Sequence, residues 1–315
     1  MGCRLVKTVI LLAAFNGDAH LPALLASLQN QTDPDFTVLM QDDGSEDNTV
    51  SVLSAAAERD SRFVFGAEQG ARLGAAGNFL SLIRQADADR VLLCDQDDEW
   101  EPEKTAVLHS AMTELEKRYG TGTPLMVHSD CSLIDEDGER IKESFFRHQG
   151  WDPAAVTLPR LLVQNNVTGC TLMMNRALCT LVADYGRAKE LPMHDWFIAL
   201  TAASFGHIAF VNRPLTRYRQ HAGNTIGASS SSLPVRGFAA LLEPQKIRRR
   251  ILLTYTHTRV FQKIYGDRLP SESRSVIESY LATQHMGKLR RILTVRRLDC
   301  LMQSGITRLG QILFG

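Results

Sequence analysis

Two features that would place a chain outside the cell or within a membrane are missing from this sequence. Its 315 residues include six cysteines but no C-x-x-C pair, and several of the six lie in apolar runs, where a free thiol packs as a small hydrophobic group. No apolar run approaches the roughly 20 residues that a membrane-spanning helix needs. We therefore expect a reducing, cytoplasmic compartment and no transmembrane segment.

The sequence also has no net charge, with 35 Lys and Arg against 35 Asp and Glu. An overall excess of positive charge, which would attract nucleic acid, is absent, so no nucleic-acid partner is expected. The balance is uneven, however, because residues 233–315 hold 15 basic and 5 acidic residues, which leaves 20 and 30 in residues 1–232. The basic part is rich in Leu and Ile with helical spacing, and its helices either lie on an anionic membrane surface or pack on the acidic part.

The first 120 residues alternate short apolar runs with helical patterns, which is typical of a doubly wound, mostly parallel α/β sheet. We predict strands over 8–14, 36–40, 63–65 and 91–94, and helices over 20–30, 47–60, 103–117 and from Gly77 onward. The loop from Gly70 to Gly77 lacks the G-x-G-x-x-G order, which argues against a Rossmann dehydrogenase. Ligands of such a sheet bind at the carboxyl ends of its strands.

The pattern changes after residue 120. We predict strands over 125–130 and 132–135 with a turn at Asp137-Gly138, a strand over 167–174, a helix that the segment 192–197 opens and that continues through Ala203, a strand over 207–211 and an extended segment over 215–221. A serine run, Ser229–Ser232, is typical of a linker. The predicted division is therefore an α/β domain over 1–228 and a basic helical region over 233–315.

An acidic segment directly follows the fourth predicted strand. Asp95, Asp97, Asp98 and Glu99 repel one another unless they share a cation, and alternation lets Asp95 and Asp97 point the same way. Carboxylate oxygens suit Mg²⁺ or Mn²⁺, which keeps open positions for phosphate oxygens. The alternative is a solvated acidic turn in front of a helix.

Three further polar segments are expected at the same edge of the sheet. Asp42 and Asp43 could hold a nucleoside or simply make the tight turn that Asp and Gly favour. Asp195, at a predicted helix start between His194 and Trp196, could be a general base or a plain helix cap. His221 could complete a metal shell or be a hydrogen-bonded structural histidine.

Taken in order, these segments resemble family 2 glycosyltransferases, and among them the rhamnosyltransferase-like branch that builds bacterial surface polysaccharide. The resemblance covers roughly residues 5–225, and Phe15 stands where that family usually has Tyr. It rests on Ala14-Phe15-Asn16-Gly17, Gln41-Asp42-Asp43-Gly44-Ser45, Gly74 with Asn78-Phe79, Cys94-Asp95-Gln96-Asp97-Asp98-Glu99-Trp100, His128-Ser129-Asp130, Val167-Thr168-Gly169-Cys170, His194-Asp195-Trp196, and Tyr218-Arg219-Gln220-His221 with Asn224.

The resemblance implies a GT-A fold and an inverting transfer from a nucleoside-diphosphate sugar, such as dTDP-rhamnose or a UDP-sugar, to a hydroxyl of a glycan or lipid-linked acceptor. A lipid-linked acceptor favours peripheral attachment at the inner face of the cell membrane. A metal-dependent nucleotidyltransferase or phosphohydrolase and a non-catalytic nucleotide-sugar-binding protein are the competing interpretations. The resemblance implies that Asp195 is the catalytic base and that Asp97 and His221 contact Mg²⁺ or Mn²⁺ and the diphosphate. It places His194 and Trp196 on the acceptor side. The residues that it implies for nucleotide-sugar binding are Phe15, Asn16, Asp42, Asp43, Asn78, Asp95 and Gln96.

Overall fold

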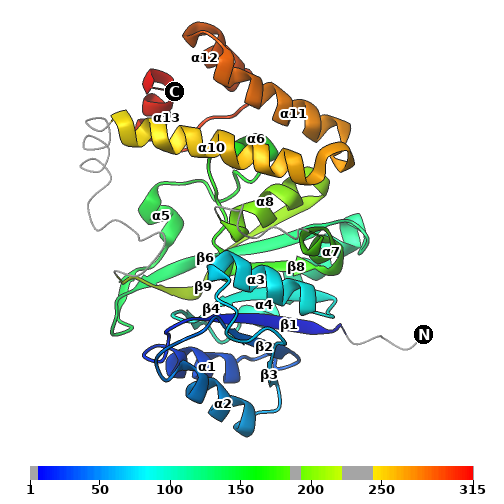
Figure 1. Ribbon diagram of the computed structural model, residues 1–315, viewed down its shortest axis with the longest axis vertical. Coiled ribbons are helices and arrows are strands. Elements are labelled where there is room, and N and C mark those ends of the chain that lie inside the picture. The colour runs from blue at the N-terminus through cyan, green and yellow to red at the C-terminus, as the bar shows by residue number, and fades with distance from the viewer. Residues whose placement is uncertain (1–5, 185–192, 222–243, 315) are drawn as a thin grey trace.

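The computed structural model describes residues 6–184, 193–221 and 244–314. One sheet runs through the lower half of the molecule, helices cover both of its faces, and the C-terminal helices stack at one end (Figure 1). In the described residues the strand order is β3-β2-β1-β4-β8-β6-β9-β5, with β7 paired to β6. This is the curled, mostly parallel α/β architecture that the sequence predicts.

The first half consists of the predicted β-α units, and its four strands are parallel. Two helix starts differ slightly from the prediction. Asp47 accepts the Thr49 N–H but precedes the helix, and the third helix begins at Gly74 rather than near Gly77. The elements are β1 (Thr8–Ala14), α1 (Leu21–Gln29), β2 (Thr37–Asp42), α2 (Thr49–Arg59), β3 (Phe63–Phe65), α3 (Gly74–Gln85) and β4 (Arg90–Asp95).

The second half adds antiparallel pairs on the other side of β4. β8 runs antiparallel to both β4 and β6, and β9 runs parallel to β6 but antiparallel to β5. The elements are β5 (Glu99–Trp100), α4 (Lys104–Tyr119), β6 (Leu125–Ile134), β7 (Arg140–Lys142), α5 (Phe145–Gln149), α6 (Leu158–Val163), the 3₁₀ turn η1 (Gly169–Thr171), β8 (Leu172–Asn175), α7 (Arg176–Ala183), α8 (His194–Phe205) and β9 (His207–Arg219).

Three strand predictions in this half need correction. The two strands expected within 125–135 are one, because β6 pairs with β9 from Leu125 to Ile134 without a break. The buried carboxylate of Asp130 accepts hydrogen bonds from Ser144 and the Cys131 N–H. The segment 167–174 begins outside regular structure, forms a 3₁₀ turn at Gly169–Thr171 and becomes a strand only at Leu172. The segments 207–211 and 215–221 are joined in a single strand, β9, which ends at Arg219 and whose register against β6 shifts twice between Val211 and Thr216. The turn predicted at Asp137-Gly138 does connect β6 to β7.

Alternate residues of the central strands supply two hydrophobic cores, one on each face of the sheet. In β1, Val9 and Leu11 belong to the core formed with α3, α7 and α8, while Ile10 and Leu12 belong to the core formed with α1, α2 and α4. The period of two therefore buries both faces, as a sheet covered on each side requires.

The C-terminal helices extend the first of these cores. Phe197 of α8 has its ring centroid 5.8 Å from those of Phe261 and Tyr265, and the Tyr265 hydroxyl lies 3.0 Å from Thr201 Oγ1. The predicted linker and domain boundary fall in 222–243, outside the described residues. The helical elements are α10 (Pro244–Tyr265), η3 (Gly266–Arg268), α11 (Ser271–Ala282), η4 (Thr283–His285), α12 (Lys288–Arg297) and α13 (Gly305–Phe314). Among the helices that the structure describes, none combines the length and the apolarity needed to cross a membrane.

Candidate active site

A cleft of about 990 Å³ opens where the strands' carboxyl ends face α8 and α10. Most of the predicted site residues line it, although they come from segments up to about 200 residues apart. Asn16 and Asp42 are not part of this lining. The predicted residues that line the cleft are Phe15, Asp43, Asn78, Asp95, Gln96, Asp97, His194, Asp195, Trp196 and His221.

The two aspartates after β2 have different partners. Asp42 folds the turn, because its Oδ2 accepts the N–H groups of Gly44 and Ser45 at 2.9 and 3.0 Å. Asp43 reaches instead to the start of α3, where its two oxygens accept the N–H groups of Leu73 and Gly74 at 2.6 and 2.7 Å. Asp43 thus fixes α3 against the cleft, whereas the carboxylate of Asp42 is occupied by the turn that its residue type favours.

Phe15 and Gln96 join the loops after β1 and β4. The Gln96 side chain accepts the Phe15 N–H at 2.6 Å and donates to the Phe15 carbonyl at 2.7 Å. A Cβ atom at Gly17 would lie 2.4 Å from Gln96 Oε1, so a residue with a side chain there would displace this bridge. Asn16 connects the same loop to the turn after β2, since its Oδ1 accepts the Glu46 N–H. The Phe15 ring itself is half exposed at the cleft.

Asp97 and His221 meet at the cleft surface. His221 Nε2 lies 2.7 Å from Asp97 Oδ2, and both side chains are about one-fifth exposed. Asp95 lines the same cleft, and burial, with the neighbouring charges of Asp97 and Asp195, raises the pKa of its carboxyl to about 7. The carboxylates of Asp97 and Asp95 are suitable ligands for Mg²⁺ or Mn²⁺, and the imidazole beside Asp97 could supply a further, nitrogen ligand.

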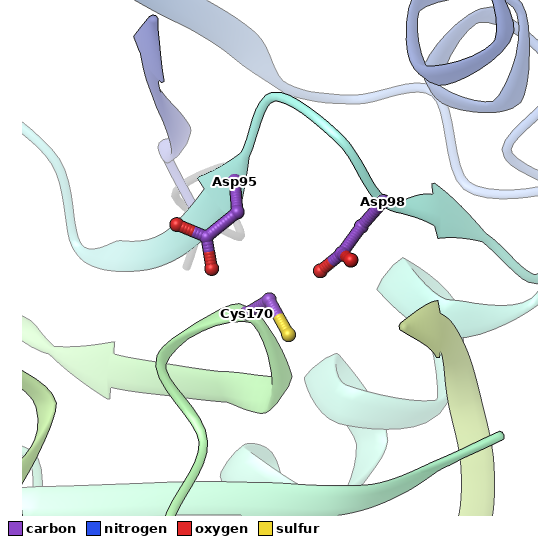
Figure 2. A group of neighbouring side chains, drawn as sticks. All are labelled: Asp95, Asp98 and Cys170. Carbon is purple, nitrogen blue, oxygen red and sulfur yellow. The ribbon is translucent and has the colours of Figure 1, made fainter. Parts of the chain in front are cut away.

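A second group of possible ligands lies deeper. Asp95, Asp98 and Cys170 point toward one another, with ligand atoms within 4.8 Å (Figure 2). Burial raises the pKa of the Cys170 thiol and of the Asp98 carboxyl well above their ordinary values, so the thiol stays protonated at neutral pH and the carboxyl ionises less readily than usual. A protonated thiol is a poor ligand, and hard cations prefer oxygen. The Asp97–His221 pair is therefore the better candidate for a divalent cation.

Asp195 occupies the first turn of α8 and is only 8% exposed. Its Oδ1 accepts the Trp196 N–H at 2.6 Å, and the Gly169 N–H and the Asn165 side chain also bind it. Burial nevertheless raises the pKa of this carboxyl to about 6. Such a group is mostly ionised at neutral pH and is more basic than an ordinary aspartate, as a general base requires.

The flanking residues of Asp195 differ in exposure to the cleft. Trp196 is mainly a core residue, because its indole N–H donates to the Leu161 carbonyl at 2.6 Å and its ring lies 4.4 Å from His257 of α10. His194 stacks on Phe79 at 4.4 Å, and burial lowers its pKa to about 4, so it is neutral. Its Nε2 has no hydrogen-bond partner among the described residues.

The family model described as glycosyl transferase family 2 matches residues 9–178, which is more than half of the chain. The chain belongs to this family. It is a glycosyltransferase, and the resemblance seen in its motifs is confirmed at the level of the family.

Two curated relatives of this family 2 glycosyltransferase are similar to it over different lengths. The dTDP-rhamnosyl transferase RfbG of Shigella flexneri is 24% identical over 233 residues, which cover 70% of this chain and 75% of the relative. The GalNAc(5)-diNAcBac-PP-undecaprenol β-1,3-glucosyltransferase of Campylobacter jejuni is 29% identical over 137 residues, 44% of this chain and 41% of the relative.

Solved structures show that the fold is shared with other glycosyltransferases. S. aureus TarS 1-349 in complex with UDP superposes with a TM-score of 0.55 at 15% identity, over 89% of this chain and 71% of that one. The mannosyltransferase PcManGT from Pyrobaculum calidifontis, in complex with GDP-Man and Mn²⁺, gives 0.51 at 15% identity, over 92% and 73%. The predicted GT-A fold is thereby confirmed.

The glycosyltransferase also contains buried charges that the sequence analysis missed. Lys104 is fully buried, and its ammonium group donates to the Cys170 carbonyl at 2.6 Å and to Thr216 Oγ1 at 2.9 Å. Burial lowers its pKa to about 8. Lys104 therefore supplies a positive charge beneath Asp95 and Asp98. The position of Lys104 in the first turn of a predicted helix does not indicate that its charge is buried.

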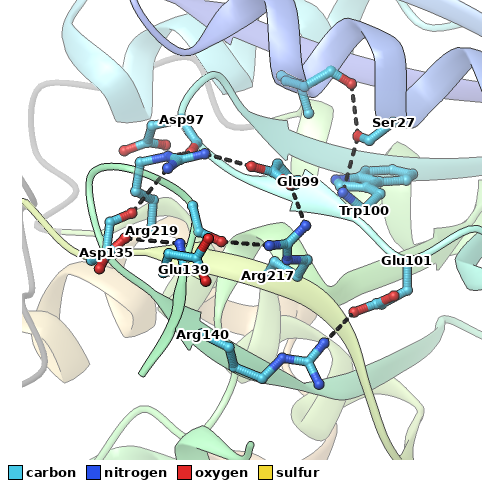
Figure 3. Close-up of polar contacts among 12 residues, drawn as sticks. Ser27, Asp97, Glu99, Trp100, Glu101, Asp135, Glu139, Arg140, Arg217 and Arg219 are labelled. Carbon is cyan, nitrogen blue, oxygen red and sulfur yellow. Dashed lines mark hydrogen bonds and ion pairs between the residues drawn. The ribbon is translucent and has the colours of Figure 1, made fainter. Parts of the chain in front are cut away.

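Arg217 and Arg219 of β9 form a second missed group (Figure 3). The two guanidinium groups share Glu99, with nitrogen–oxygen distances of 2.6 and 2.7 Å. Arg219 also donates to the carbonyls of Asp97 and Asp135, at 2.8 and 2.9 Å. These contacts hold the backbone at Asp97 against the end of β9, where His221 follows.

Proposed function

We propose that this glycosyltransferase moves a sugar, with inversion, from a nucleoside-diphosphate sugar to an acceptor hydroxyl that Asp195 deprotonates. The observation that carries the proposal is a buried, basic carboxylate in the same cleft as the Asp97–His221 pair. An inverting displacement needs one base on the acceptor side and neutralisation of the leaving diphosphate on the other. Asp195 would supply the base from α8. The Asp97–His221 pair would supply the neutralisation of charge from the loop between β4 and β5 and from the residues after β9.

On the donor side, Phe15, Asp43 and Asn78 would contact the nucleotide. The exposed Phe15 ring offers a stacking surface for a base, and the Asn78 Oδ1 atom is buried with no hydrogen-bond partner in the described residues. Asp95 would hold a ribose or sugar hydroxyl, while Asn16, Asp42 and Gln96 would shape the loops around the nucleotide. The UDP, UDP-GlcNAc and GDP-Man complexes of the structural neighbours support a nucleotide-sugar donor. The relative RfbG favours dTDP-rhamnose among the donors.

Asp97 and His221 would hold Mg²⁺ or Mn²⁺. A divalent cation bound there would neutralise charge on the diphosphate. The Mn²⁺ complex of the mannosyltransferase supports this assignment. Arg219 donates a hydrogen bond to the backbone carbonyl of Asp97 and so holds this residue in place. The carboxylate of Asp97 contacts His221.

On the acceptor side, His194 and Trp196 would flank the hydroxyl, and α10 completes the wall with Arg250, Leu253 and Thr254. We propose a glycan or lipid-linked acceptor and a position at the cytoplasmic face of the membrane. A purely nucleotide-sugar-binding role would need neither Asp97 nor Asp195, yet both line the cleft.

Replacing Asp195 tests the function directly. Asp195→Asn should retain donor affinity and lose about 10²–10⁴-fold in turnover, the range for a positioned base. We would measure release of nucleoside diphosphate from a panel of dTDP- and UDP-sugars, with binding by calorimetry in Mn²⁺. Asp137→Asn, at an exposed position on the β6–β7 hairpin, is the matched control. Parental turnover in Asp195→Asn, or loss of donor binding in a folded protein, would refute the assignment.

A further inference from the structure

The outer face of α12 exposes two leucines one helical turn apart. Leu289 is 80% exposed and Leu293 is 68% exposed, the largest values among the large hydrophobic side chains of the described residues. The opposite side of the helix is buried through Val295. Residues four apart share one face of a helix, so Leu289 and Leu293 form an apolar ridge that the fold does not use.

α13 contributes a second pair of the same kind beside the ridge. Leu309 and Leu313, again four residues apart, are 43% and 44% exposed. The Lys288 ammonium group donates to the Leu313 carbonyl at 3.1 Å, which ties the start of α12 to the end of α13. Both helices lie at the end of the molecule opposite α1 and α2 (Figure 1). We call these four leucines and the cations of α12 the α12–α13 surface.

Positive charge surrounds the leucines. The ten residues of α12, KLRRILTVRR, include five cations and no acid, and α13 contains no acid either. Lys288, Arg290, Arg296 and Arg297 are exposed. Within the C-terminal helical region, Arg268 and Arg274 form salt bridges among the described residues. None of the salt bridges between described residues includes an arginine of α12. The positive charge of α12 is thus presented to the surroundings together with the apolar ridge.

We propose that the α12–α13 surface docks on an anionic lipid membrane. Leucines separated by Lys and Arg suit a headgroup boundary, where the apolar side chains enter the acyl region and the cations face lipid phosphates. A protein partner would have to cover an 80% exposed leucine and pair several cations at once, whereas a fluid anionic surface meets both demands without a fixed geometry. The charge complementarity therefore favours lipid.

The position of α10 gives this docking a consequence for the reaction. One segment of α10 lines the cleft through Arg250, Leu253 and Thr254. Close by, α13 packs so tightly on α10 that a Cβ atom at Gly310 would lie 2.9 Å from Ile247 Cδ1. A membrane bound by α12 and α13 would thus lie near the acceptor wall of the cleft. The delivery of a lipid-linked acceptor rests on the proposed function, but the lipid binding itself does not.

Vesicle co-sedimentation of the full chain tests the proposal. The probes are phosphatidylcholine vesicles with and without 30% phosphatidylglycerol, at low and high salt. We expect binding to the anionic vesicles only, weakened by salt. Leu289→Asp with Leu293→Asp should reduce partitioning at least tenfold. Arg290→Gln with Arg296→Gln should reduce it about 25-fold at low salt, since each cation near an anionic surface contributes about fivefold.

The control is the pair Ile141→Asp and Lys142→Gln on β7, where a 47% exposed isoleucine stands beside an exposed lysine. This control should bind vesicles like the parent, and all variants should keep the parental melting temperature and rate of donor hydrolysis. Equal sedimentation of the ridge variant and the parent would overturn the proposal. The proposal would also be overturned if the parent did not bind vesicles but formed oligomers that the variant Leu289→Asp with Leu293→Asp did not form. The surface would then bind a second copy of the chain. Inactivity of all proteins with donor, alongside normal vesicle binding, would count against the proposed function alone.

Discussion

Removing the buried carboxylate of Asp195 should stabilise the protein at neutral pH while it lowers turnover by about 10²–10⁴-fold. Burial raises the pKa of this group from the ordinary 3.8 to about 6, so the folded chain holds the proton more tightly than the unfolded chain does. Between these two values the unfolded state binds fewer protons, and the free energy of unfolding falls as pH rises. At about 1.4 kcal/mol per pH unit, the loss amounts to about 3 kcal/mol above pH 6. Asp195→Asn has no proton to lose and escapes this penalty.

The expected signature is a stability difference that depends on pH. At pH 4, where the carboxyl is protonated in the folded state and partly ionised in the unfolded state, the parent has lost little of its stability and the Asn variant should lie within about 1 kcal/mol of it, because its amide accepts the hydrogen bonds of Asp195 less well. From pH 4 to pH 7 the difference should move by about 2 kcal/mol in favour of the variant, since part of the total loss has already occurred at pH 4. Urea denaturation at pH 4.5, 5.5, 6.5 and 7.5 measures it, with Asp137→Asn as control. A difference that stays constant across this range would show that the carboxyl of Asp195 is not desolvated as described.

Two other substitutions test the metal site and the packing of the sheet. Asp97→Asn should abolish the dependence of donor binding on divalent cations and leave the melting temperature unchanged, because it removes one ligand at the cleft surface; calorimetry with and without Mn²⁺ checks this, and parental turnover would contradict the assignment. Gly206→Ala should cost about 3 kcal/mol of stability, since the added Cβ would lie 1.7 Å from the Pro124 carbonyl oxygen. Gly122→Ala, with no atom within 4 Å of the added Cβ, is the matched control in the same denaturation experiment.

Local sequence patterns predict the first half of the fold well because each β-α unit carries its own signal. Leu21, Leu24, Leu25 and Leu28 repeat with helical spacing and are all buried in α1. The segment 167–174 is different. Its backbone forms a 3₁₀ turn at Gly169–Thr171, and the Cys170 carbonyl accepts a hydrogen bond from Lys104, 66 residues earlier in the chain. No local pattern can report such a contact.

The candidate site shows the same division. Asp42, Asp43, Asp95 and Asp97 could be predicted because they lie at or just after the ends of strands, and parallel strands bring their carboxyl ends to one edge. Asp195 could be predicted because it opens a helix beside them. The hydrogen-bond and ion-pair partners around those acids could not be predicted. In the sequence, Arg219 resembles any other residue of an amphipathic strand. In the structure, it is only 3% exposed and binds Glu99 and the Asp97 carbonyl across the sheet. Asp42 was equally ambiguous in the sequence, and only the fold shows its carboxylate accepting hydrogen bonds from its own turn.

The pairing of β5 with β9 also sets the order in which the site can form during synthesis. Glu99 pairs with Arg217, and Asp97 contacts His221 across 124 residues of sequence. At 5–20 residues per second, a ribosome needs roughly 6–25 s to make that intervening length. The four parallel strands β1–β4 are all synthesised by residue 95 and can pair within that time, whereas the contact between Asp97 and His221 has to wait for the end of β9. A nascent chain therefore passes through a stage in which the acidic edge of the sheet exists without the imidazole that completes it.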